Sequence, residues 1–376
     1  MALYVNMGIN IFERKLNSGN SEGTDSVFVV AEIGKNFIQT ERERPHEEYI
    51  DNAKRLIDAA KEAGVDAVKF QTHEVEDEQA DVDCFYPHFG GMDRFRWVSK
   101  NTDIASLKFW IEVKKHAELK GVVFFSTPMS RKAAIKLESI GVPFWKIGSG
   151  DIEDYVLLDY VSSTGKPIVI STGMVSKNEL DAVVGFLKSK NVSFSILYCV
   201  SKYPCPKDKF NLSSIEYLRN KYPDVTIGFS NHNYEDSELD LAAIKLGARI
   251  IEKHFSFDRN MWGSDHRVSV TPEEMKNLVE LIKKRKYASV DVEPYYGNIE
   301  AEFDGANNEF RSYFKKTLVA GRDIKEGETI NKEMVYAMRP ASYLKGLSSN
   351  YFISVLGKRA AKHIKKFTPL NDALFK

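Results

Sequence analysis

The sequence predicts an α/β protein: a closed parallel (β/α)8 barrel (TIM barrel) followed by a small, mostly irregular and β-rich domain. Eight short apolar runs alternate with amphipathic segments over residues 27–288, and near-continuous apolar strands are typical of parallel sheets that helices cover. The main alternative is an open, doubly wound sheet, whose first strand normally ends in a glycine-rich loop. Here the first strand runs into residues 31–34 (AEIG), which contain a single glycine, so we favour the closed barrel.

The hydrophobic pattern places each element in turn. The expected strands are residues 27–31, 65–70, 121–126, 142–146, 167–171, 193–199, 224–229 and 248–254. The expected helices between them lie near residues 47–63, 104–119, 131–140, 153–163, 177–189, 212–221 and 236–246. An eighth helix follows the last strand, because Thr271 suits an N-cap, Pro272 the first helical position and Glu274 a capping box. Its apolar stripe is Met275, Leu278, Val279 and Ile282.

The chain divides into an N-terminal extension (residues 1–26), the barrel (27–288), a linker (289–312) and a C-terminal domain (313–376). The linker is polar and irregular, whereas the C-terminal domain has short apolar runs with turn signals every few residues. Residues 73–104 form a long insertion after the second strand. Because loops of this length in a compact domain are usually functional, we expect a lid over the barrel mouth.

The composition excludes several classes of protein. With 43% hydrophobic and 28% charged residues, the chain of 376 residues is not wholly disordered. Its 53 basic residues balance its 53 acidic ones, so no bulk positive field favours a nucleic-acid partner. We find neither an export signal near the start nor an apolar run of the roughly 18 residues that a membrane span needs. Three cysteines are too few for a disulfide framework, and we expect a cytoplasmic protein without a membrane partner.

Polar residues gather where the expected strands end, which is the face on which barrels of this type place their active sites. They are Glu32, Lys69, Gln71, Ser126, Thr127, Lys146, Ser149, Ser171, Thr172, Tyr203, Ser230, His232 and His254. Lys69 and Lys146 lie inside apolar runs, where a charged amine is costly unless it is paired or faces a polar cavity. The alternative is that each lysine extends to solvent at the barrel rim. With the hydroxyls of the nearby serines, the two lysines predict a cradle for a phosphate group.

Two histidines point to a metal. His232 and His254 end the seventh and eighth expected strands, which are neighbours in a barrel, and two imidazoles with open positions suit a divalent cation that also binds substrate. The alternative is one histidine that orders the site and one that packs in the core.

Seven ordered sequence blocks resemble the sialic acid synthases (N-acetylneuraminate synthases). They are residues 31–36 (AEIGKN), 67–71 (AVKFQ), 145–151 (WKIGSGD), 170–174 (ISTGM), 227–232 (IGFSNH), 251–255 (IEKHF) and 263–266 (GSDH). Residues 313–376 resemble the antifreeze-like (SAF) domain that ends those enzymes, through residues 320–327 (AGRDIKEG), 338–340 (MRP) and 356–358 (LGK).

This resemblance implies a reaction in which phosphoenolpyruvate condenses with an N-acyl hexosamine, typically N-acetylmannosamine, and releases phosphate to give a nine-carbon 2-keto sugar acid. The resemblance also assigns roles to the site residues. The residues implied to bind substrate are Lys69, Gln71, Lys146, Ser149, Ser171 and Ser230, and those implied to contact the sugar are Tyr203 and Arg339. His232 and His254 are implied to bind manganese (with magnesium or cobalt as alternatives), and Glu32 and Asp265 to transfer protons. The resemblance further implies a homodimer in which the C-terminal domain of one chain caps the barrel of the other.

The sequence departs from the family pattern at Phe37, Ser201 and Asn231, and in residues 341–345 after Arg339-Pro340. We expect these departures to lie near the acceptor sugar, so the acceptor stays open, and a legionaminic acid, pseudaminic acid or 9-phosphate synthase is an alternative. From other classes, the alternatives are a Schiff-base aldolase that uses Lys69 or Lys146, a metal-dependent hydrolase, and a non-catalytic carbohydrate-binding or ice-binding protein.

Overall fold

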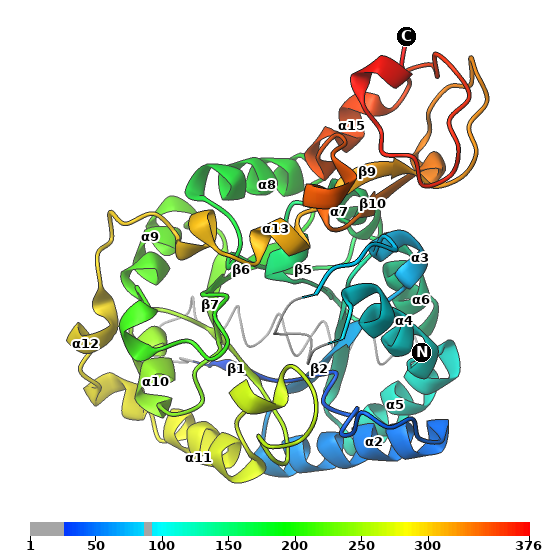
Figure 1. Ribbon diagram of the computed structural model, residues 1–376. Helices are drawn as coiled ribbons and strands as arrows, with labels where there is room; N and C mark the ends of the chain where they lie inside the picture. The colour runs from blue at the N-terminus through cyan, green and yellow to red at the C-terminus, as the bar shows by residue number, and fades with distance from the viewer. Residues whose placement is uncertain (1–25, 86–91) are drawn as a thin grey trace.

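The computed structural model describes residues 26–85 and 92–376. Its centre is one parallel sheet with the strand order β3-β2-β1-β8-β7-β6-β5-β4. The strands are β1 (Phe28–Gly34), β2 (Ala67–Thr72), β3 (Val123–Pro128), β4 (Trp145–Ile147), β5 (Ile168–Ser171), β6 (Phe194–Cys199), β7 (Thr226–Asn231) and β8 (Ile250–His254). The two end strands, β3 and β4, lie against each other, so the sheet curls into a nearly closed barrel (Figure 1). The predicted barrel fold is confirmed.

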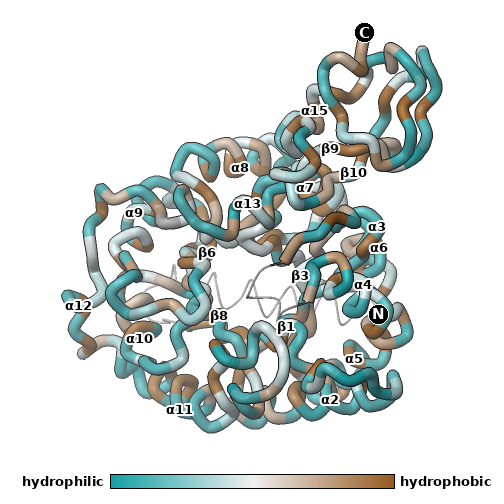
Figure 2. The backbone as a smooth tube through the Cα atoms, viewed as in Figure 1, coloured by the Kyte–Doolittle hydropathy of each residue, from teal (hydrophilic) through white to brown (hydrophobic). Residues whose placement is uncertain are grey.

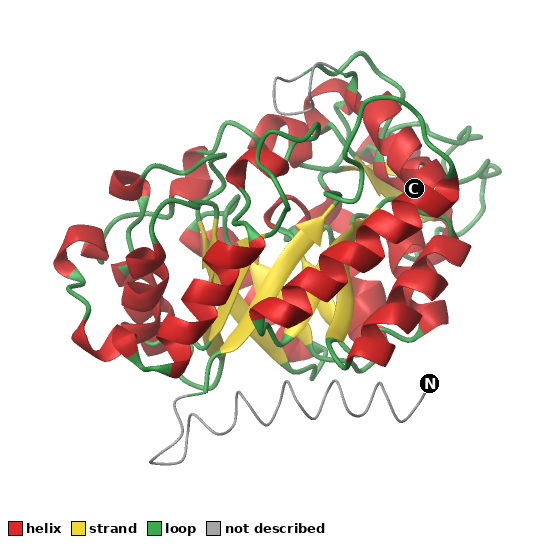
Figure 3. Cartoon of the chain, turned by 90° about the horizontal axis from the view of Figure 1, so that it is seen from below, coloured by secondary structure: helices red, strands yellow, loops and turns green. Residues whose placement is uncertain are grey.

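Helices surround this barrel on the outside (Figures 1 and 3). Those that alternate with the strands are α2 (His46–Ala63), α5 (Leu107–Lys120), α6 (Arg131–Ile140), α7 (Tyr155–Ser163), α8 (Lys177–Ser189), α9 (Ser213–Lys221), α10 (Ser237–Lys245) and α11 (Pro272–Lys283). Helix α11 starts as predicted, because the side chains of Thr271 and Glu274 form a reciprocal capping box and Pro272 occupies the first turn. Helix α2 ends at Gly64, whose φ of 88° is a conformation that glycine adopts without strain.

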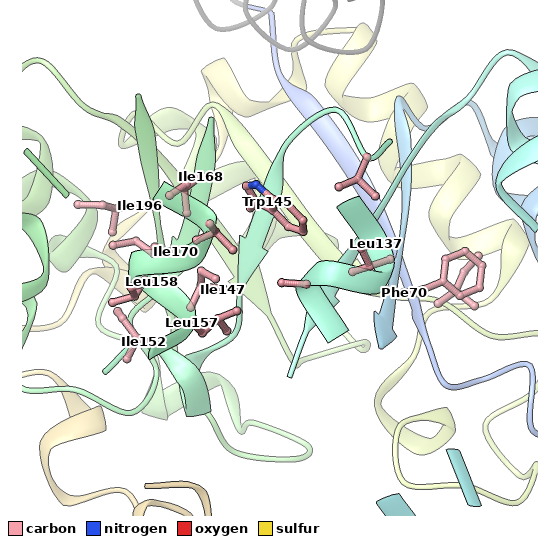
Figure 4. Close-up of a cluster of buried hydrophobic side chains, with 14 of the residues drawn as sticks. Phe70, Leu137, Trp145, Ile147, Ile152, Leu157, Leu158, Ile168, Ile170 and Ile196 are labelled. Atoms are coloured by element: carbon pink, nitrogen blue, oxygen red, sulfur yellow. The ribbon is translucent and has the colours of Figure 1, made fainter. Parts of the chain in front are cut away.

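Two apolar cores follow from the alternation of side chains along each strand. One set of strand residues fills the barrel interior: Phe28, Val30, Ala67, Val123, Phe125, Phe144, Val169, Leu197 and Ile250. The other set packs outward against the helices, and Figure 4 shows Ile168 and Ile170 of β5 near Leu157 and Leu158 of α7. The brown, apolar stretches of Figure 2 accordingly follow the barrel strands.

The insertion after β2 is more regular than the sequence indicated. It contains α3 (Val75–Glu78) and α4 (Arg94–Ile104), and Asp93 caps α4 by accepting a hydrogen bond from the Arg96 amide at 3.1 Å. Most of the predicted N-terminal extension lies outside the described residues. Among the helices that are described, none has the length and apolar character of a membrane span.

After α11 the chain passes through α12 (Glu293–Tyr296) and α13 (Arg311–Phe314) to a small antiparallel sheet of β9 (Thr317–Ala320) and β10 (Val335–Met338). Two short helices, α14 (Ala341–Leu344) and α15 (Phe352–Val355), complete this region. It stands to one side of the barrel, next to α7 and α3 (Figure 1), and the predicted small, mostly irregular β-rich region is confirmed.

Candidate active site

One cavity lies at the carboxyl ends of the barrel strands, where a parallel barrel brings its last strand residues together. All but one of the predicted site residues line it: Glu32, Lys69, Gln71, Lys146, Ser149, Ser171, Tyr203, Ser230, His232, His254 and Asp265. The exception is Arg339, which lies behind the cavity wall. The fold therefore collects residues that are far apart in the chain.

Buried ion pairs form the floor of this cavity. The Lys69 Nζ atom lies 2.7 Å from Glu32 Oε2 and 3.5 Å from Glu252 Oε1. The Lys146 Nζ atom donates to both oxygens of Glu252, at 2.9 and 3.1 Å. Ser230 Oγ donates to Glu252 Oε1 at 3.2 Å. Three of the residues predicted to bind the phosphate group thus share one carboxylate.

Glu252 is a site residue that was not predicted from the sequence. It stands two residues before His254 in β8, and side chains two apart along a strand point to the same face. Because His254 was placed in the site, this period of two was the signal that identifies Glu252.

Burial and charge together set the protonation of this cluster. Burial raises the pKa of Glu32, and Lys69 offsets only part of that rise. Burial lowers the pKa of Lys69, but Glu252 and Glu32 outweigh it, so this pKa lies above its ordinary value. Burial would raise the pKa of Glu252, yet Lys146 and Lys69 hold it at about 2. Glu252 is therefore an ionised counter-charge, whereas Glu32 is suited to exchange a proton.

Hydroxyl groups line the same side of the cavity. Thr127 Oγ1 accepts a hydrogen bond from Lys69 Nζ at 3.2 Å, and Ser149 Oγ accepts one from the Gly173 amide at 3.0 Å. Ser171 Oγ is buried and has no hydrogen-bond partner among the described residues. Because a buried hydroxyl without a partner is costly, the Ser171 hydroxyl is suited to contact a ligand.

The two predicted metal ligands meet at the adjacent ends of β7 and β8. Their ring centroids lie 5.3 Å apart, and the Tyr203 ring lies 4.2 Å from that of His232. The Nδ1 atom of His232 lies 2.8 Å from the carbonyl oxygen of Val200, a contact in which Nδ1 donates and the lone pair of Nε2 is left for a ligand.

The donor set fits a cation that keeps open positions. Burial lowers the pKa of His254 to about 3, so its ring is neutral, and its buried Nδ1 has no hydrogen-bond partner among the described residues. For His232, burial lowers the pKa, but the neighbouring Cys199 and the Val200 carbonyl outweigh burial, so this pKa lies above its ordinary value. The described part of the chain holds no group of three His, Cys, Asp or Glu side chains around one point, so a cation held by His232 and His254 would need substrate or water as further ligands.

A chain of polar contacts joins the two predicted catalytic carboxylates. Gln71 Nε2 donates to Glu32 Oε1 at 2.8 Å, and Lys35 Nζ donates to Gln71 Oε1 at 2.5 Å. The Lys35 ammonium also lies 3.4 Å from Asp265 Oδ2. Lys35 belongs to the first sequence block but was not predicted to act in the site.

The insertion and the linker supply further cavity residues that the sequence did not indicate. His73, Arg94 and Trp97 come from the insertion, Phe310 comes from the linker, and Phe314 comes from the start of the C-terminal domain. The insertion therefore reaches the barrel mouth, where a lid was expected.

Arg339 contacts the barrel of its own chain. Its side chain is fully buried and its Nη2 pairs with Asp151, a cavity-lining residue. The Arg339 amide donates to the carbonyl oxygen of Glu78 at 2.9 Å, and the Ala80 amide donates to the carbonyl oxygen of Arg339 at 2.9 Å. The guanidinium lies 5.2 Å from the centre of the Phe314 ring, so Asp151 and Phe314 stand between Arg339 and the cavity.

None of the departures from the family pattern, which are Phe37, Ser201, Asn231 and residues 341–345, lines the cavity. Phe37 packs in the outer core, 4.7 Å from the Phe109 ring. The Ser201 carbonyl accepts a hydrogen bond from Asn308, and Asn231 Nδ2 donates to Asp240 at 2.8 Å. These residues therefore do not contact the cavity directly, although they were expected to lie near the acceptor sugar.

Comparison with known proteins places the chain among sugar acid synthases. Residues 56–293 match the NeuB family, and residues 315–376 match the SAF domain. The chain is 30% identical to the N-acetylneuraminate-9-phosphate synthase of Drosophila melanogaster, over 92% of this chain and 95% of that protein. It is also 30% identical to the N,N'-diacetyllegionaminic acid synthase of Campylobacter jejuni, over 90% of this chain and 97% of that protein.

A solved structure agrees with these relatives. The crystal structure of the spore coat polysaccharide biosynthesis protein SpsE from Bacillus subtilis superposes with a TM-score of 0.71 and 30% identity, and covers 92% of this chain and 94% of that one. With the family match spanning well over half of the sequence, the resemblance seen in the sequence is confirmed, and the chain belongs to the NeuB family.

Proposed function

We propose that this protein condenses phosphoenolpyruvate with an N-acyl hexosamine, N-acetylmannosamine or a close relative, to give a nine-carbon 2-keto sugar acid and phosphate. The relatives named as sugar acid synthases support the general class of reaction. The observation that supports these reactants is the cavity itself, in which two buried lysines, two histidines and two linked carboxylates face one space.

Lys69 and Lys146 hold the phosphate group of phosphoenolpyruvate. The hydroxyl groups of Ser149, Ser171 and Ser230 donate hydrogen bonds to it. Charge-assisted contacts of this kind are strong in a buried site, where solvent screens little. Both lysines pair with Glu252, which favours their charged form before the substrate binds.

His232 and His254 are the residues that would hold a divalent cation, for which manganese is our first choice. When bound there, such a cation polarises the acceptor aldehyde as a Lewis acid. The open coordination positions, which the described residues leave unfilled, suit this role.

The remaining steps move electrons and protons. C3 of the enol bonds to the aldehyde carbon, and water adds to C2. The bond between C2 and the phosphate oxygen then breaks as the C2 hydroxyl becomes the keto oxygen, and the proton of that hydroxyl leaves with the phosphate. Glu32, whose pKa burial raises, supplies the proton that the aldehyde oxygen takes up. Asp265, which lies 3.4 Å from Lys35, accepts the proton that the added water loses. The lysines hold the departing phosphate as its charge grows.

Phosphate release from phosphoenolpyruvate against a panel of acceptors tests this proposal. N-acetylmannosamine, its 6-phosphate and di-N-acetylated hexosamines are incubated separately with the protein, phosphoenolpyruvate and manganese. We expect release with at least one acceptor and none without an acceptor, together with a product of the summed carbon skeleton by mass spectrometry. Release that does not depend on an acceptor would identify a hydrolase and contradict the proposal.

A homodimer with exchanged C-terminal domains is a separate proposal, which the family resemblance supports. In the single chain, Arg339 reaches its own barrel, so exchange is not needed to bring it to Asp151. Mixing an Arg339→Ala chain with a His232→Ala, His254→Ala chain decides between the two arrangements. Activity returns in mixed dimers only if the domains are exchanged.

We further propose a reducing, cytoplasmic location. Cys84 and Cys199 are buried and form no disulfide, which supports it.

A further inference from the structure

The strap, defined as residues 303–314, crosses the mouth of the barrel where the linker meets the C-terminal domain (Figure 1 shows its helix α13 beside β5 and β6). Hydrogen bonds and an ion pair from its side chains hold the strap against the barrel. Asn308 Nδ2 donates to the Ser201 carbonyl at 2.8 Å, and Arg311 Nη1 donates to the Met174 carbonyl at 3.1 Å. Arg311 also pairs with Glu179 through both terminal nitrogens, at 2.8 and 2.5 Å. The strap is therefore a fixed part of the barrel mouth.

Two glycines leave the room that the strap needs. A Cβ atom on Gly305 would lie 2.7 Å from the Val175 amide nitrogen. A Cβ atom on Gly150 would lie 2.6 Å from Cδ1 of Phe314. Real side chains do not approach so closely, so the absence of a side chain at Gly150 is what allows the Phe314 ring to lie against the loop after β4.

The strap contributes two aromatic rings to the cavity, Phe310 and Phe314, whose centroids lie 6.2 Å apart. The Phe310 ring meets Tyr203 edge to face at 5.7 Å. The Phe314 ring lies 4.6 Å from the guanidinium of Arg94 and 5.2 Å from that of Arg339. Attraction between cations and an aromatic face holds this ring in place.

These rings form an apolar wall beside a floor of charges. An apolar wall contributes to binding only when an apolar group of the ligand covers it and removes its surface from water. Phosphoenolpyruvate offers a phosphate and a carboxylate, and the body of a hexosamine offers hydroxyls. The N-acyl chain is the apolar group of these two reactants.

We propose that Phe310 and Phe314 receive the N-acyl group of the acceptor sugar and determine which acyl groups the enzyme accepts. The inference rests on the proposed function, and it assigns specificity to the strap and not to the barrel strands. Both rings are packed against neighbours that hold them, so they limit the length of the acyl chain.

Acceptors of increasing acyl length test this assignment. The full-length protein and its Phe310→Ala and Phe314→Ala variants are given phosphoenolpyruvate, manganese and mannosamine that carries an N-acetyl, N-propanoyl, N-butanoyl or N-pentanoyl group. Phosphate release gives kcat/KM for each acceptor and KM for phosphoenolpyruvate. We expect the ratio of kcat/KM for the N-pentanoyl to the N-acetyl acceptor to rise at least tenfold in each variant, with KM for phosphoenolpyruvate unchanged.

Two further variants serve as controls. Phe314→Leu keeps an apolar side chain of smaller size and should shift the preference by one or two methylenes, even if the alanine variant folds poorly. Phe367→Ala makes the same chemical change at a half-exposed ring in the C-terminal domain and should leave the preference as it is.

The outcomes separate this inference from the proposed function. If the parent protein releases phosphate but the acyl preference of the folded variants does not change, the inference is wrong and the proposed function stands. A raised KM for phosphoenolpyruvate with unchanged acceptor preference also overturns the inference, because it places the strap at the other substrate. If the parent releases no phosphate with any acceptor, the proposed function fails and the inference fails with it.

Discussion

The carboxylate of Glu252 accepts hydrogen bonds from the ammonium group of Lys146 with both of its oxygens, at 2.9 and 3.1 Å, and both side chains are buried. Lys146 has no other carboxylate partner among the described residues, whereas Lys69 also pairs with Glu32. The charge of Lys146 therefore depends on one side chain.

Replacing that carboxylate should make activity sensitive to pH. Burial lowers the pKa of Lys146 and Glu252 opposes this, so Glu252→Gln lowers the pKa further. Because the proposed role needs the protonated amine, the alkaline limb of the pH profile should move to lower pH, and KM for phosphoenolpyruvate should rise about tenfold or more at pH 8. Glu252→Asp keeps the charge and should retain the parent profile. A limb that stays in place or moves to higher pH would contradict this role.

Removing either lysine should weaken binding of phosphoenolpyruvate. Lys69→Met and Lys146→Met each remove a charge-assisted contact, which corresponds to roughly 10- to 100-fold in KM. Lys202→Met, which alters a lysine outside the cavity lining, is the control. Treatment with borohydride in the presence of substrate should leave no adduct on either lysine, and a stable adduct would instead establish the Schiff-base aldolase.

Metal removal should abolish the reaction. Chelation is expected to reduce phosphate release to background, and manganese should restore it. The His232→Ala, His254→Ala double variant should bind no manganese after dialysis, as measured by elemental analysis, while His363→Ala, at an exposed position in the C-terminal domain, binds as the parent does. Full activity in the double variant would rule out the assignment.

The stability of the insertion should depend on pH through Asp77. Burial raises the pKa of this carboxyl from 3.8 to about 6. Below about pH 4 this carboxyl is protonated in both the folded and the unfolded chain, so it does not lower the free energy of unfolding. As pH rises toward 6, only the unfolded chain releases its proton, so the free energy of unfolding falls, by about 3 kcal/mol in all.

Asp77→Asn removes this titration and keeps an oxygen that accepts from the Lys132 amide, which donates to Asp77 at 2.8 Å. Urea unfolding between pH 4 and 8 should show the variant gaining stability over the parent up to about pH 6 and no more above it. Asp83→Asn, at an exposed carboxyl of the same segment, should show no such gain. A difference independent of pH would exclude the mechanism.

The barrel and most of its cavity were predictable because both follow from local patterns. Eight apolar runs of strand length define the sheet, and a residue at the end of a parallel strand faces the barrel mouth wherever the strand lies. That is why Lys69, Lys146 and His254 were found without knowledge of their neighbours. Glu252 was not predicted, although the two-residue alternation of side chains along β8 places it on the same face as His254.

The rest depends on contacts between distant segments. Phe310 and Phe314 reach the cavity because Asn308 bonds to Ser201, which lies 107 residues earlier in the chain. No local pattern in a polar linker indicates such docking. Arg94 likewise enters the cavity through the fold of an insertion whose two helices the hydrophobic pattern did not indicate.

The pairing of Arg339 and Lys316 with Asp151 determines whether the C-terminal region can be removed from the barrel or exchanged for that of a relative. Both cations belong to the C-terminal region, and Lys316 also pairs with Asp154, at 2.7 Å. A barrel separated from that region would lose both cations that balance Asp151 and Asp154, two carboxylates that are buried in the whole chain. The C-terminal region is therefore not a detachable module. A chimera that takes it from a relative will be stable only if it brings a matching pair of cations.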